Sequence, residues 1–234
     1  MVTKEAIVLA GGLGLRLKGV LPDIPKCMAP VQGRPFLTYV LDYLERQTIS
    51  KVILSVGYRK EQIISFFGNN YNSLKIEYSV ENEPLGTGGA LKKALALCSE
   101  NEVFVLNGDT YFVPDLNELE KQHFKNYADI SIAVIQKLDT SRYGLIVTDS
   151  TDRIIEFREK EPTSGKGWIN GGVYLIKKKI VETIRDNKFS LENDVFKAKS
   201  ASLHIHAYRT DAFFLDIGIP EDYNLAQTLL TENI

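Results

Sequence analysis

The sequence predicts an α/β protein with three layers, in which helices cover both faces of a central, mixed but mostly parallel sheet of Rossmann-like type. Short, wholly apolar runs alternate with segments whose apolar residues recur at helical spacing. The run at 7–10 leads directly into a glycine-rich turn, and the strand expected at 102–106, apolar over 103–106, ends in Asn-Gly-Asp. Because ligands of such sheets bind at the carboxyl ends of strands, both ends are candidate parts of a site.

In the first half of the chain, strands and helices alternate. Residues 51–57 (KVILSVG) form a second buried strand, and residues 74–80 alternate apolar and polar side chains as a half-buried strand does. The helix at 35–47 begins with proline, which suits a first helical turn. Further helices are expected at 60–67 and, entered through glycines, at 88–97.

After residue 115 the pattern becomes more mixed. A helix at 116–127 precedes short strands at 129–136, 144–148, 153–157 and 168–176. The second and third of these strands flank a polar turn and predict a hairpin. We expect helices at 178–186, 191–199 and 220–230, and extended chain at 203–208 and 213–216. The last helix carries Pro220, Glu221 and Asp222 in its first turn, where they favour the helix dipole.

The composition is that of an ordinary globular protein, with 234 residues, 44% hydrophobic and 25% charged. The net charge of -2 favours neither nucleic acid nor an anionic membrane, and no apolar stretch approaches a membrane span or a signal peptide. We therefore expect a cytoplasmic protein with no nucleic-acid or membrane partner. Cys27 and Cys98 match no metal or redox spacing and are expected to be free thiols, and His204 and His206 to be structural.

The turn after the first strand combines glycines with cations. Glycines let the backbone approach a ligand closely, with amides free to bind phosphate oxygens. The turn holds Gly11, Gly12 and Gly14, then Arg16, Lys18 and Lys26, with Pro22 and Pro25 stiffening the approach to the last lysine. Neither GxxxxGK[ST] nor GxGxxG is present. The arrangement suits a polyphosphate, although the glycines alone would also suit a plain strand-to-helix turn.

Two carboxylates end apolar runs far apart in the chain. Asp109 follows VFVLNG, and Asp216 closes FFLD with Gly218 beyond it. Mg²⁺ prefers hard oxygen ligands together with phosphate oxygens and waters, so two carboxylates at strand ends could hold one ion. A turn or helix-cap role is the alternative for each aspartate alone.

Several segments together resemble a known family. The pattern GGLGLRL followed by PK resembles the GGxGTRL and PK signature of the sugar-1-phosphate nucleotidyltransferases, with Leu15 in place of threonine. LGTGGAL, the Gly-Asp at Asp109, EFREKEP with Glu161 inserted, NGGVY and DIGIPEDY are similar to further family motifs. The resemblance implies the nucleotidyltransferase fold and one domain, 1–234, with a nucleotide-binding half of about 1–115 and a sugar-binding half of about 116–234.

The resemblance also implies roles for the matching residues. The implied nucleotide contacts are Leu9, Ala10, Gly11, Gly12, Gly14, Arg16, Lys26, Leu85, Gly86, Thr87, Gly108 and Asp109. The implied sugar-phosphate contacts are Tyr143, Gly144, Glu159, Lys160, Asn170, Gly171 and Gly172. The implied catalytic residues are Arg16, Lys26, Asp109 and Asp216, the two aspartates being the Mg²⁺ ligands. Gly88-Gly89 replaces the usual Ala-Gly, which would leave room for a purine.

Within the family, Leu15, the NGGVY segment and the overall run of the sequence resemble the D-glycero-α-D-manno-heptose 1-phosphate guanylyltransferases. This resemblance implies that GTP and the heptose 1-phosphate are substrates, that pyrophosphate is released, and that the protein is a homodimer. The alternatives are mannose-1-phosphate guanylyltransferase, glucose-1-phosphate thymidylyltransferase and N-acetylmuramate-1-phosphate uridylyltransferase. A non-catalytic regulatory subunit that binds a nucleotide sugar is the alternative of another class.

Overall fold

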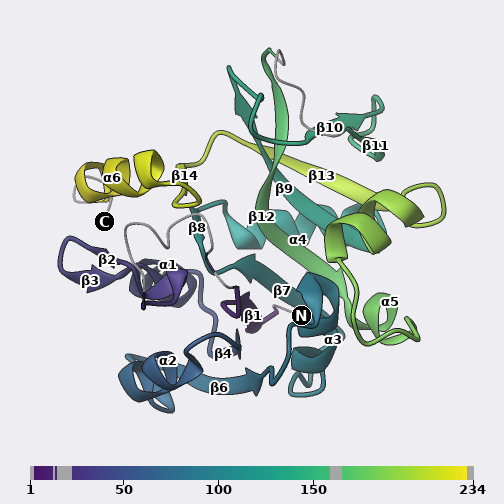
Figure 1. The fold of residues 1–234 in the computed structure, drawn as a ribbon. Helices are drawn as coiled ribbons and strands as arrows, with labels where there is room; N and C mark the ends of the chain where they lie inside the picture. The colour runs from purple at the N-terminus through teal and green to yellow at the C-terminus, as the bar shows by residue number, and fades with distance from the viewer. Residues whose placement is uncertain (1–2, 13, 15–22, 159–164, 231–234) are drawn as a thin grey trace.

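The computed structural model describes residues 3–12, 14, 23–158 and 165–230. Within this part of the chain a ten-stranded sheet runs in the order β11-β10-β12-β7-β1-β4-β6-β5, and β9 pairs with both β12 and β13 (Figure 1). Its strands are β1 (Glu5–Leu9), β4 (Lys51–Val56), β5 (Asn70–Tyr71), β6 (Leu74–Val80), β7 (Glu102–Asn107), β9 (Ile130–Lys137), β10 (Leu145–Thr148), β11 (Ile154–Arg158), β12 (Gly167–Lys177) and β13 (Ile205–Thr210).

The centre of the sheet is parallel. β1 pairs in parallel with β4 on one side and with β7 on the other, so Ile7 lies between Ile53 and Val105. β4 in turn pairs in parallel with β6, whereas β12 joins β7 in antiparallel orientation. The carboxyl ends of β6, β4, β1 and β7 therefore form one continuous edge.

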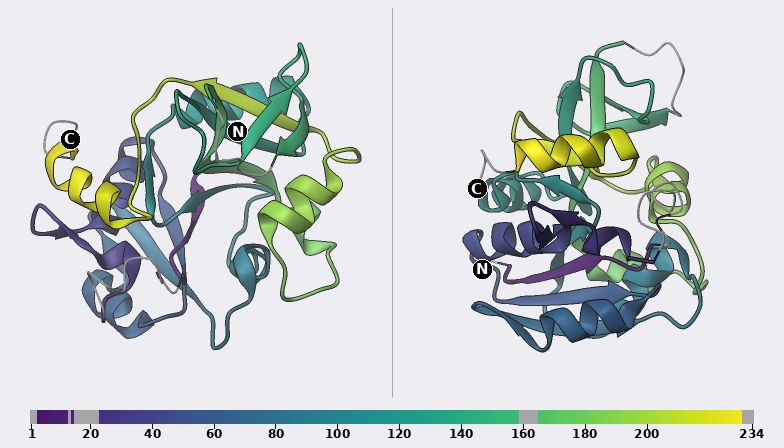
Figure 2. Two further views of the ribbon diagram at one scale, coloured as in Figure 1. Left: turned by 45° about the horizontal axis from the view of Figure 1, so that its top comes forward. Right: turned by 60° about the vertical axis from the view of Figure 1, so that its left-hand side comes forward.

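Helices cover both faces of this sheet. The helices are α1 (Phe36–Arg46), α2 (Lys60–Phe67), α3 (Gly86–Leu95), α4 (Leu116–Lys125), α5 (Lys178–Glu182) and α6 (Pro220–Leu229), with a 3₁₀ turn η2 (Lys26–Met28) and a π-helix η3 (Leu191–Lys197). Ala6 and Val8 pack with α1, α2, α4 and α6, while Ile7 packs with α3, α5 and η3. The two opposite faces can be followed in Figures 1 and 2. The predicted three-layer α/β fold is confirmed.

The structure departs from the predicted elements at several ends. The helix expected at 178–186 stops at Glu182, since the chain beyond it turns to place the carbonyls of Ile184 and Asp186 on Lys92 Nζ. The segment predicted as a helix at 191–199 is the π-helix η3 over Leu191–Lys197, and residues 198–199 continue it in α-helical form. Short pairs that the sequence analysis did not predict are β2 (Pro30–Val31) with β3 (Arg34–Pro35), and β8 (Thr110–Phe112) with β14 (Phe214–Asp216).

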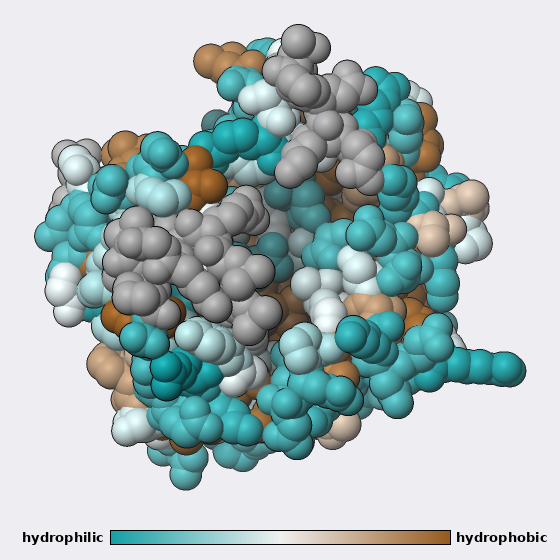
Figure 3. All heavy atoms as spheres, in the orientation of Figure 1, coloured by the Kyte–Doolittle hydropathy of each residue, from teal (hydrophilic) through white to brown (hydrophobic). Residues whose placement is uncertain are grey.

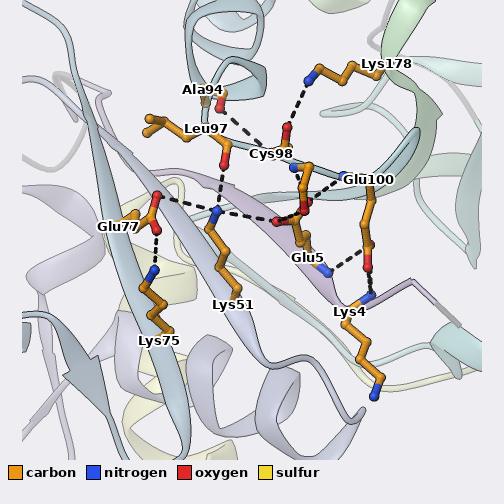
Figure 4. A network of polar contacts seen from close by, with 11 residues as sticks. Lys4, Glu5, Lys51, Lys75, Glu77, Ala94, Leu97, Cys98, Glu100 and Lys178 are labelled. Atoms are coloured by element: carbon orange, nitrogen blue, oxygen red, sulfur yellow. Dashed lines mark hydrogen bonds and ion pairs between the residues drawn. The ribbon is translucent and has the colours of Figure 1, made fainter.

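A polar network fixes the amino-terminal edge of the sheet (Figure 4). The carboxylate of Glu5, which is 5% exposed, accepts hydrogen bonds from the amides of Ser99 and Glu100 at 2.7 and 2.9 Å. It also forms an ion pair with Lys51 at 3.4 Å. Burial acts to raise the pKa of Glu5, but the bonds from the Glu100 and Ser99 amides outweigh it and the pKa is lowered. The network ties β1 to β4 and to the start of β7.

Both cysteines are buried, and so is His206, one of the two histidines expected to be structural. Cys27 and Cys98 are buried free thiols, as predicted. His206 lies on β13, is buried, and has Nε2 3.3 Å from Asn126 Nδ2, whereas His204 precedes that strand. None of the described helices is long and apolar enough to cross a membrane.

Candidate active site

A cavity of about 540 Å³ opens at the carboxyl ends of the parallel strands. In the space-filling view of Figure 3 the surface on this side is hollowed near its centre. The described residues that line the cavity are Leu9, Ala10, Gly11, Gly12, Gly14, Lys26, Cys27, Ser55, Glu81, Pro84, Gly86, Thr87, Ala90, Asn107, Gly108, Asp109, Glu192 and Gly218. Ten of the implied nucleotide contacts are among them. Leu85 is not among them, and Arg16 lies outside the described residues.

A lysine between two carboxylates forms the charged end of the cavity. Lys26 Nζ donates a hydrogen bond to Asp109 Oδ2 at 2.6 Å and lies 3.7 Å from Asp216 Oδ1. The side chains of Lys26, Asp109 and Asp216 are 11%, 42% and 26% exposed. One cation is therefore shared by two anions at a partly solvated site.

The small sheet β8–β14 brings the two aspartates together. Asp216 pairs with Thr110 in this antiparallel ladder, and the amide of Ile217 donates to the carbonyl of Asp109 at 3.1 Å. Asp109 is the second residue after β7. The residue between them, Gly108, donates its amide to the carbonyl of Leu9 at 3.0 Å. The aspartate is thus anchored to the end of β1 on one side and to β14 on the other.

The electrostatics of the site favour an additional cation. Burial raises the pKa of Asp216, and the charge of Asp109 raises it further, while Lys26 and the Gly218 amide oppose the shift. Burial also raises the pKa of the neighbouring Cys27 thiol to about 12, so it is not a nucleophile. No group of three or more His, Cys, Asp or Glu in the described part of the chain could hold a metal. Two carboxylates are nevertheless a set that Mg²⁺ accepts when phosphate and water complete the coordination.

The glycine-rich turn serves two purposes. A Cβ on Gly11 would lie 2.5 Å from Glu81 Oε1, so this glycine lets the Glu81 carboxylate lie against the turn. Gly12 has nothing within 4 Å of an added Cβ, so its backbone faces open space in the cavity. The close packing at the first position and the open backbone at the second together shape the cavity floor.

The Gly88-Gly89 pair does not provide room for a base. A Cβ on Gly88 would lie 2.2 Å from the Phe189 ring, and one on Gly89 would lie 2.2 Å from the carbonyl of Asn187. The amides of both glycines donate to the Phe189 carbonyl, at 3.0 and 3.3 Å. The interpretation of these glycines as space for a purine is therefore wrong, because the 187–189 segment fills that space and occupies the amides at the start of α3.

The implied sugar-phosphate contacts that the structure describes are not among the residues that line this cavity. Asn170 Oδ1 accepts the Gly172 amide at 2.9 Å, and a Cβ on Gly171 would lie 2.2 Å from the Phe112 ring. The register of β12 against β9 shifts between Asn170 and Tyr174. These glycines allow close packing on β8 and the end of β7.

Tyr143 and Gly144 precede β10 and lie near Asp216. The Tyr143 ring packs edge-on against Phe214 at 6.2 Å, and Asp216 contributes to the raised pKa of Tyr143, for which burial is the larger cause. Gly144 approaches the carbonyl of Arg158. Glu159 and Lys160 lie outside the described residues.

Four polar cavity residues were missed by the motifs. Ser55 and Glu81 lie at the carboxyl ends of β4 and β6, and Asn107 at that of β7, so the strand-end rule would have found them. Glu192 comes from η3 and approaches the cavity only through tertiary packing.

Comparisons with known proteins agree with this architecture. The chain is 45% identical over 231 residues to the D-glycero-alpha-D-manno-heptose 1-phosphate guanylyltransferase of Aneurinibacillus thermoaerophilus, covering 98% of this chain and 100% of that protein. The enzyme of the same name from Campylobacter jejuni is 44% identical over 220 residues, covering 94% and 96%.

A solved structure is also similar. The crystal structure of HddC from Yersinia pseudotuberculosis complexed with GMP-PN superposes with a TM-score of 0.86 at 39% identity, covering 96% of this chain and 98% of that one. Residues 5–233 match the family described as "Nucleotidyl transferase". With this match over almost the whole chain, the protein belongs to the nucleotidyl transferase family.

Proposed function

We propose that this protein transfers GMP from GTP to D-glycero-α-D-manno-heptose 1-phosphate and releases pyrophosphate. The relatives at 45% and 44% identity carry that activity in their names and span nearly the whole chain. The observation on this chain that supports the transfer best is Lys26 held between Asp109 and Asp216 at the end of the cavity. A fixed cation between two carboxylates suits the α-phosphoryl group of a nucleotide.

The chain's own residues act by positioning and charge. A sugar phosphate is already ionised, so its oxygen can attack the α-phosphorus in line without a general base. Lys26 carries three donors, and the bond to Asp109 leaves others free for a phosphate oxygen. Alignment of two bound anions can supply up to ~7–11 kcal/mol of the barrier. Arg16 and Lys160 would add positive charge at the leaving group and at the sugar phosphate.

Asp109 and Asp216 fit a role as ligands of Mg²⁺. The two carboxylates approach the same lysine, and burial, followed by the charge of Asp109, raises the pKa of Asp216. Mg²⁺ binds through one or two carboxylates together with substrate phosphates. When bound, it would neutralise charge on the α-phosphoryl group and the pyrophosphate.

Glu81 supports guanine as the base. Its Oε2 accepts the Leu85 amide at 3.1 Å, and its Oε1 lies 3.5 Å from Ser55 Oγ. The side chain follows β6, three strands away from the β7 end that carries Asp109, which is about 14 Å at the usual strand spacing. This separation suits a nucleotide whose phosphates lie at the end of β7 and whose base lies at the end of β6. Guanine presents two adjacent donors, N1–H and N2–H, whereas the other bases pair a donor with acceptors.

The setting of the reaction belongs to the same proposal. The product, a GDP-heptose, is an activated sugar for glycosyl transfer in capsule or lipopolysaccharide synthesis. Because its proposed substrates include a free nucleotide, we propose that the enzyme acts in the cytoplasm, and we expect it to be a homodimer. The sugar 1-phosphate would be held near Tyr143, Gly144, Glu159, Lys160, Asn170, Gly171 and Gly172.

The test is pyrophosphate release with Mg²⁺ across a grid of nucleotides and sugar 1-phosphates. GTP, dTTP, UTP, CTP and ATP are each paired with heptose, mannose, glucose and N-acetylmuramic acid 1-phosphates. Release with GTP and the manno-heptose phosphate alone is expected. Release with another nucleotide and sugar 1-phosphate would identify that pair as the substrates instead. Mannose 1-phosphate is included because a mannose-1-phosphate guanylyltransferase of Mycobacterium tuberculosis is 33% identical to this chain. Folded protein that binds GDP-sugars without releasing pyrophosphate would be a regulatory subunit.

A further inference from the structure

The second half of the chain contributes a carboxylate to the cavity that no motif predicted. Among the described lining residues, Glu192 and Gly218 alone come from beyond residue 116. Glu192 is the second residue of η3, and its side chain reaches Thr87 in the first turn of α3. The carboxylate therefore lies where the two halves of the sequence meet.

One oxygen of this carboxylate is held in place. Thr87 Oγ1 donates to Glu192 Oε2 at 2.6 Å, and Ser190 Oγ donates to the same oxygen at 2.9 Å. The Leu191 amide donates to Thr87 Oγ1 at 2.9 Å, which orients the threonine hydroxyl towards the carboxylate. Two hydroxyl donors on one oxygen position the whole group, as a preorganised binding site requires.

The other oxygen is available to a ligand. Within the described part of the chain no hydrogen bond reaches Glu192 Oε1 and no Lys, Arg or His forms an ion pair with the carboxylate. An ionised carboxylate only accepts hydrogen bonds, so its ligand must be a donor. The phosphates of the substrates are anions and would be repelled. A neutral hydroxyl is the complementary group.

The position of Glu192 favours the sugar over the base. Glu192 lies on η3, whose Phe196 ring packs against the Tyr174 ring of β12 with the ring centroids 5.1 Å apart, so η3 borders β12. β12 adjoins β7 on the side opposite β1, β4 and β6, whereas Glu81 follows β6 at the far end of the same edge. With the phosphates near Asp109 at β7, a base directed to β6 leaves the β12 side to the sugar.

We propose that Glu192 is a sugar-recognition residue whose Oε1 accepts a hydrogen bond from a hydroxyl of the sugar 1-phosphate, while Thr87 and Ser190 position the carboxylate. The proposal rests on the proposed function, since it presumes that a sugar 1-phosphate is the acceptor. In this proposal the Thr87 hydroxyl donates a hydrogen bond to Glu192 and so positions it. The hydroxyl does not contact the nucleotide directly.

The test compares steady-state constants for both substrates. Glu192→Gln and Glu192→Ala are measured beside wild type, with Glu61→Gln on the exposed face of α2 as the matched control. We expect the KM for the sugar 1-phosphate to rise about 10- to 100-fold, the range for a lost hydrogen bond to a charged group. The KM for GTP should stay within about twofold of the wild-type value. In the Glu61→Gln control, the KM values for both substrates should do the same. Ser190→Ala should raise the sugar KM in the same direction but less.

Deoxy analogues of the sugar 1-phosphate identify the hydroxyl. Removing the contacted hydroxyl should weaken binding to wild type but leave Glu192→Ala unchanged, a coupling that a purely structural residue would not produce. A rise in the GTP KM alone would assign Glu192 to the ribose and overturn the proposal. Unchanged constants in a folded variant would overturn it too. Failure of the proposed function would differ, since wild type would then release no pyrophosphate with any sugar 1-phosphate.

Discussion

Lys26 Nζ lies 2.6 Å from Asp109 Oδ2, although 83 residues separate the two positions in the sequence. The lysine leaves the 3₁₀ turn η2 after the glycine-rich segment, and the aspartate follows β7. Because β1 and β7 are neighbours in the parallel sheet, the segments after their carboxyl ends meet over one cavity. This contact joins the glycine-rich segment after β1 to the strand end that carries Asp109.

Lys26→Met should lower turnover at least ~100-fold while the fold survives, because a fixed cation at developing charge typically contributes that much. The lysine is the cation shared by Asp109 and Asp216, so its loss removes charge from the reacting centre and none from the core. Pyrophosphate release gives the rate and circular dichroism the fold. Lys121→Met, an exposed change on α4, is the control. A folded and fully active Lys26→Met protein would contradict the assignment.

Asp109→Asn and Asp216→Asn should each raise the Mg²⁺ concentration needed for half-maximal rate and lower the maximal rate. Each substitution keeps the shape but removes one of the two charges that face Lys26. A titration of rate against Mg²⁺ measures the effect, with the exposed Asp186→Asn as the control. An unchanged Mg²⁺ titration in both variants would reject the metal role.

Glu81→Gln should weaken GTP binding by about 10- to 100-fold and reduce discrimination against UTP, since an amide replaces one acceptor oxygen by a donor. The Leu85 amide can still bond to the remaining carbonyl oxygen, so the fold should be kept. Competition between GTP and UTP for the same enzyme measures the ratio directly. A ratio equal to that of wild type would show that Glu81 does not contact the base.

The unfolding free energy should fall as the pH drops below about 6.5. Burial lowers the pKa of His123 to about 4, whereas an unfolded histidine titrates near 6.5. Between these values the unfolded state binds a proton that the folded state does not, so stability is lost as pH falls, at up to ~1.4 kcal/mol per pH unit. Denaturant unfolding from pH 7 to 4 measures the slope. His123→Gln should reduce the slope without abolishing it, because the pKa of His206 is also lowered by burial.

Glu5→Ala should destabilise the fold by about 1–3 kcal/mol, since it leaves the amides of Ser99 and Glu100 without their acceptor. Thermal unfolding measures the loss, and the KM values should not change, because the network lies at the amino-terminal edge of the sheet (Figure 4). Glu77→Ala in the more exposed outer part of the network is the comparison and should cost less. Equal losses of stability in the two variants would mean that the buried hydrogen bonds of Glu5 stabilise the fold no more than the more exposed contacts of Glu77.

Local chemistry in the sequence was enough to predict the strands, most helices and the strand ends that border the cavity. Buried parallel strands are nearly continuous apolar runs, so the run that contains Ile7 and the glycine-rich turn that contains Gly12 predicted the edge of the sheet at which the cavity opens. The same reasoning found Asp109 and Asp216, because each ends an apolar run.

Packing between distant segments decided the rest. Glu192 and Thr87 are 105 positions apart, so no local pattern could predict their bond. Gly88 reads as helix entry or ligand space in the sequence, yet the Phe189 ring occupies its free side. Lys26 can share Asp109 and Asp216 only because β8 pairs with β14. Side chains meet across elements only after the chain has folded, and a carboxylate's role depends on which charges and donors then surround it.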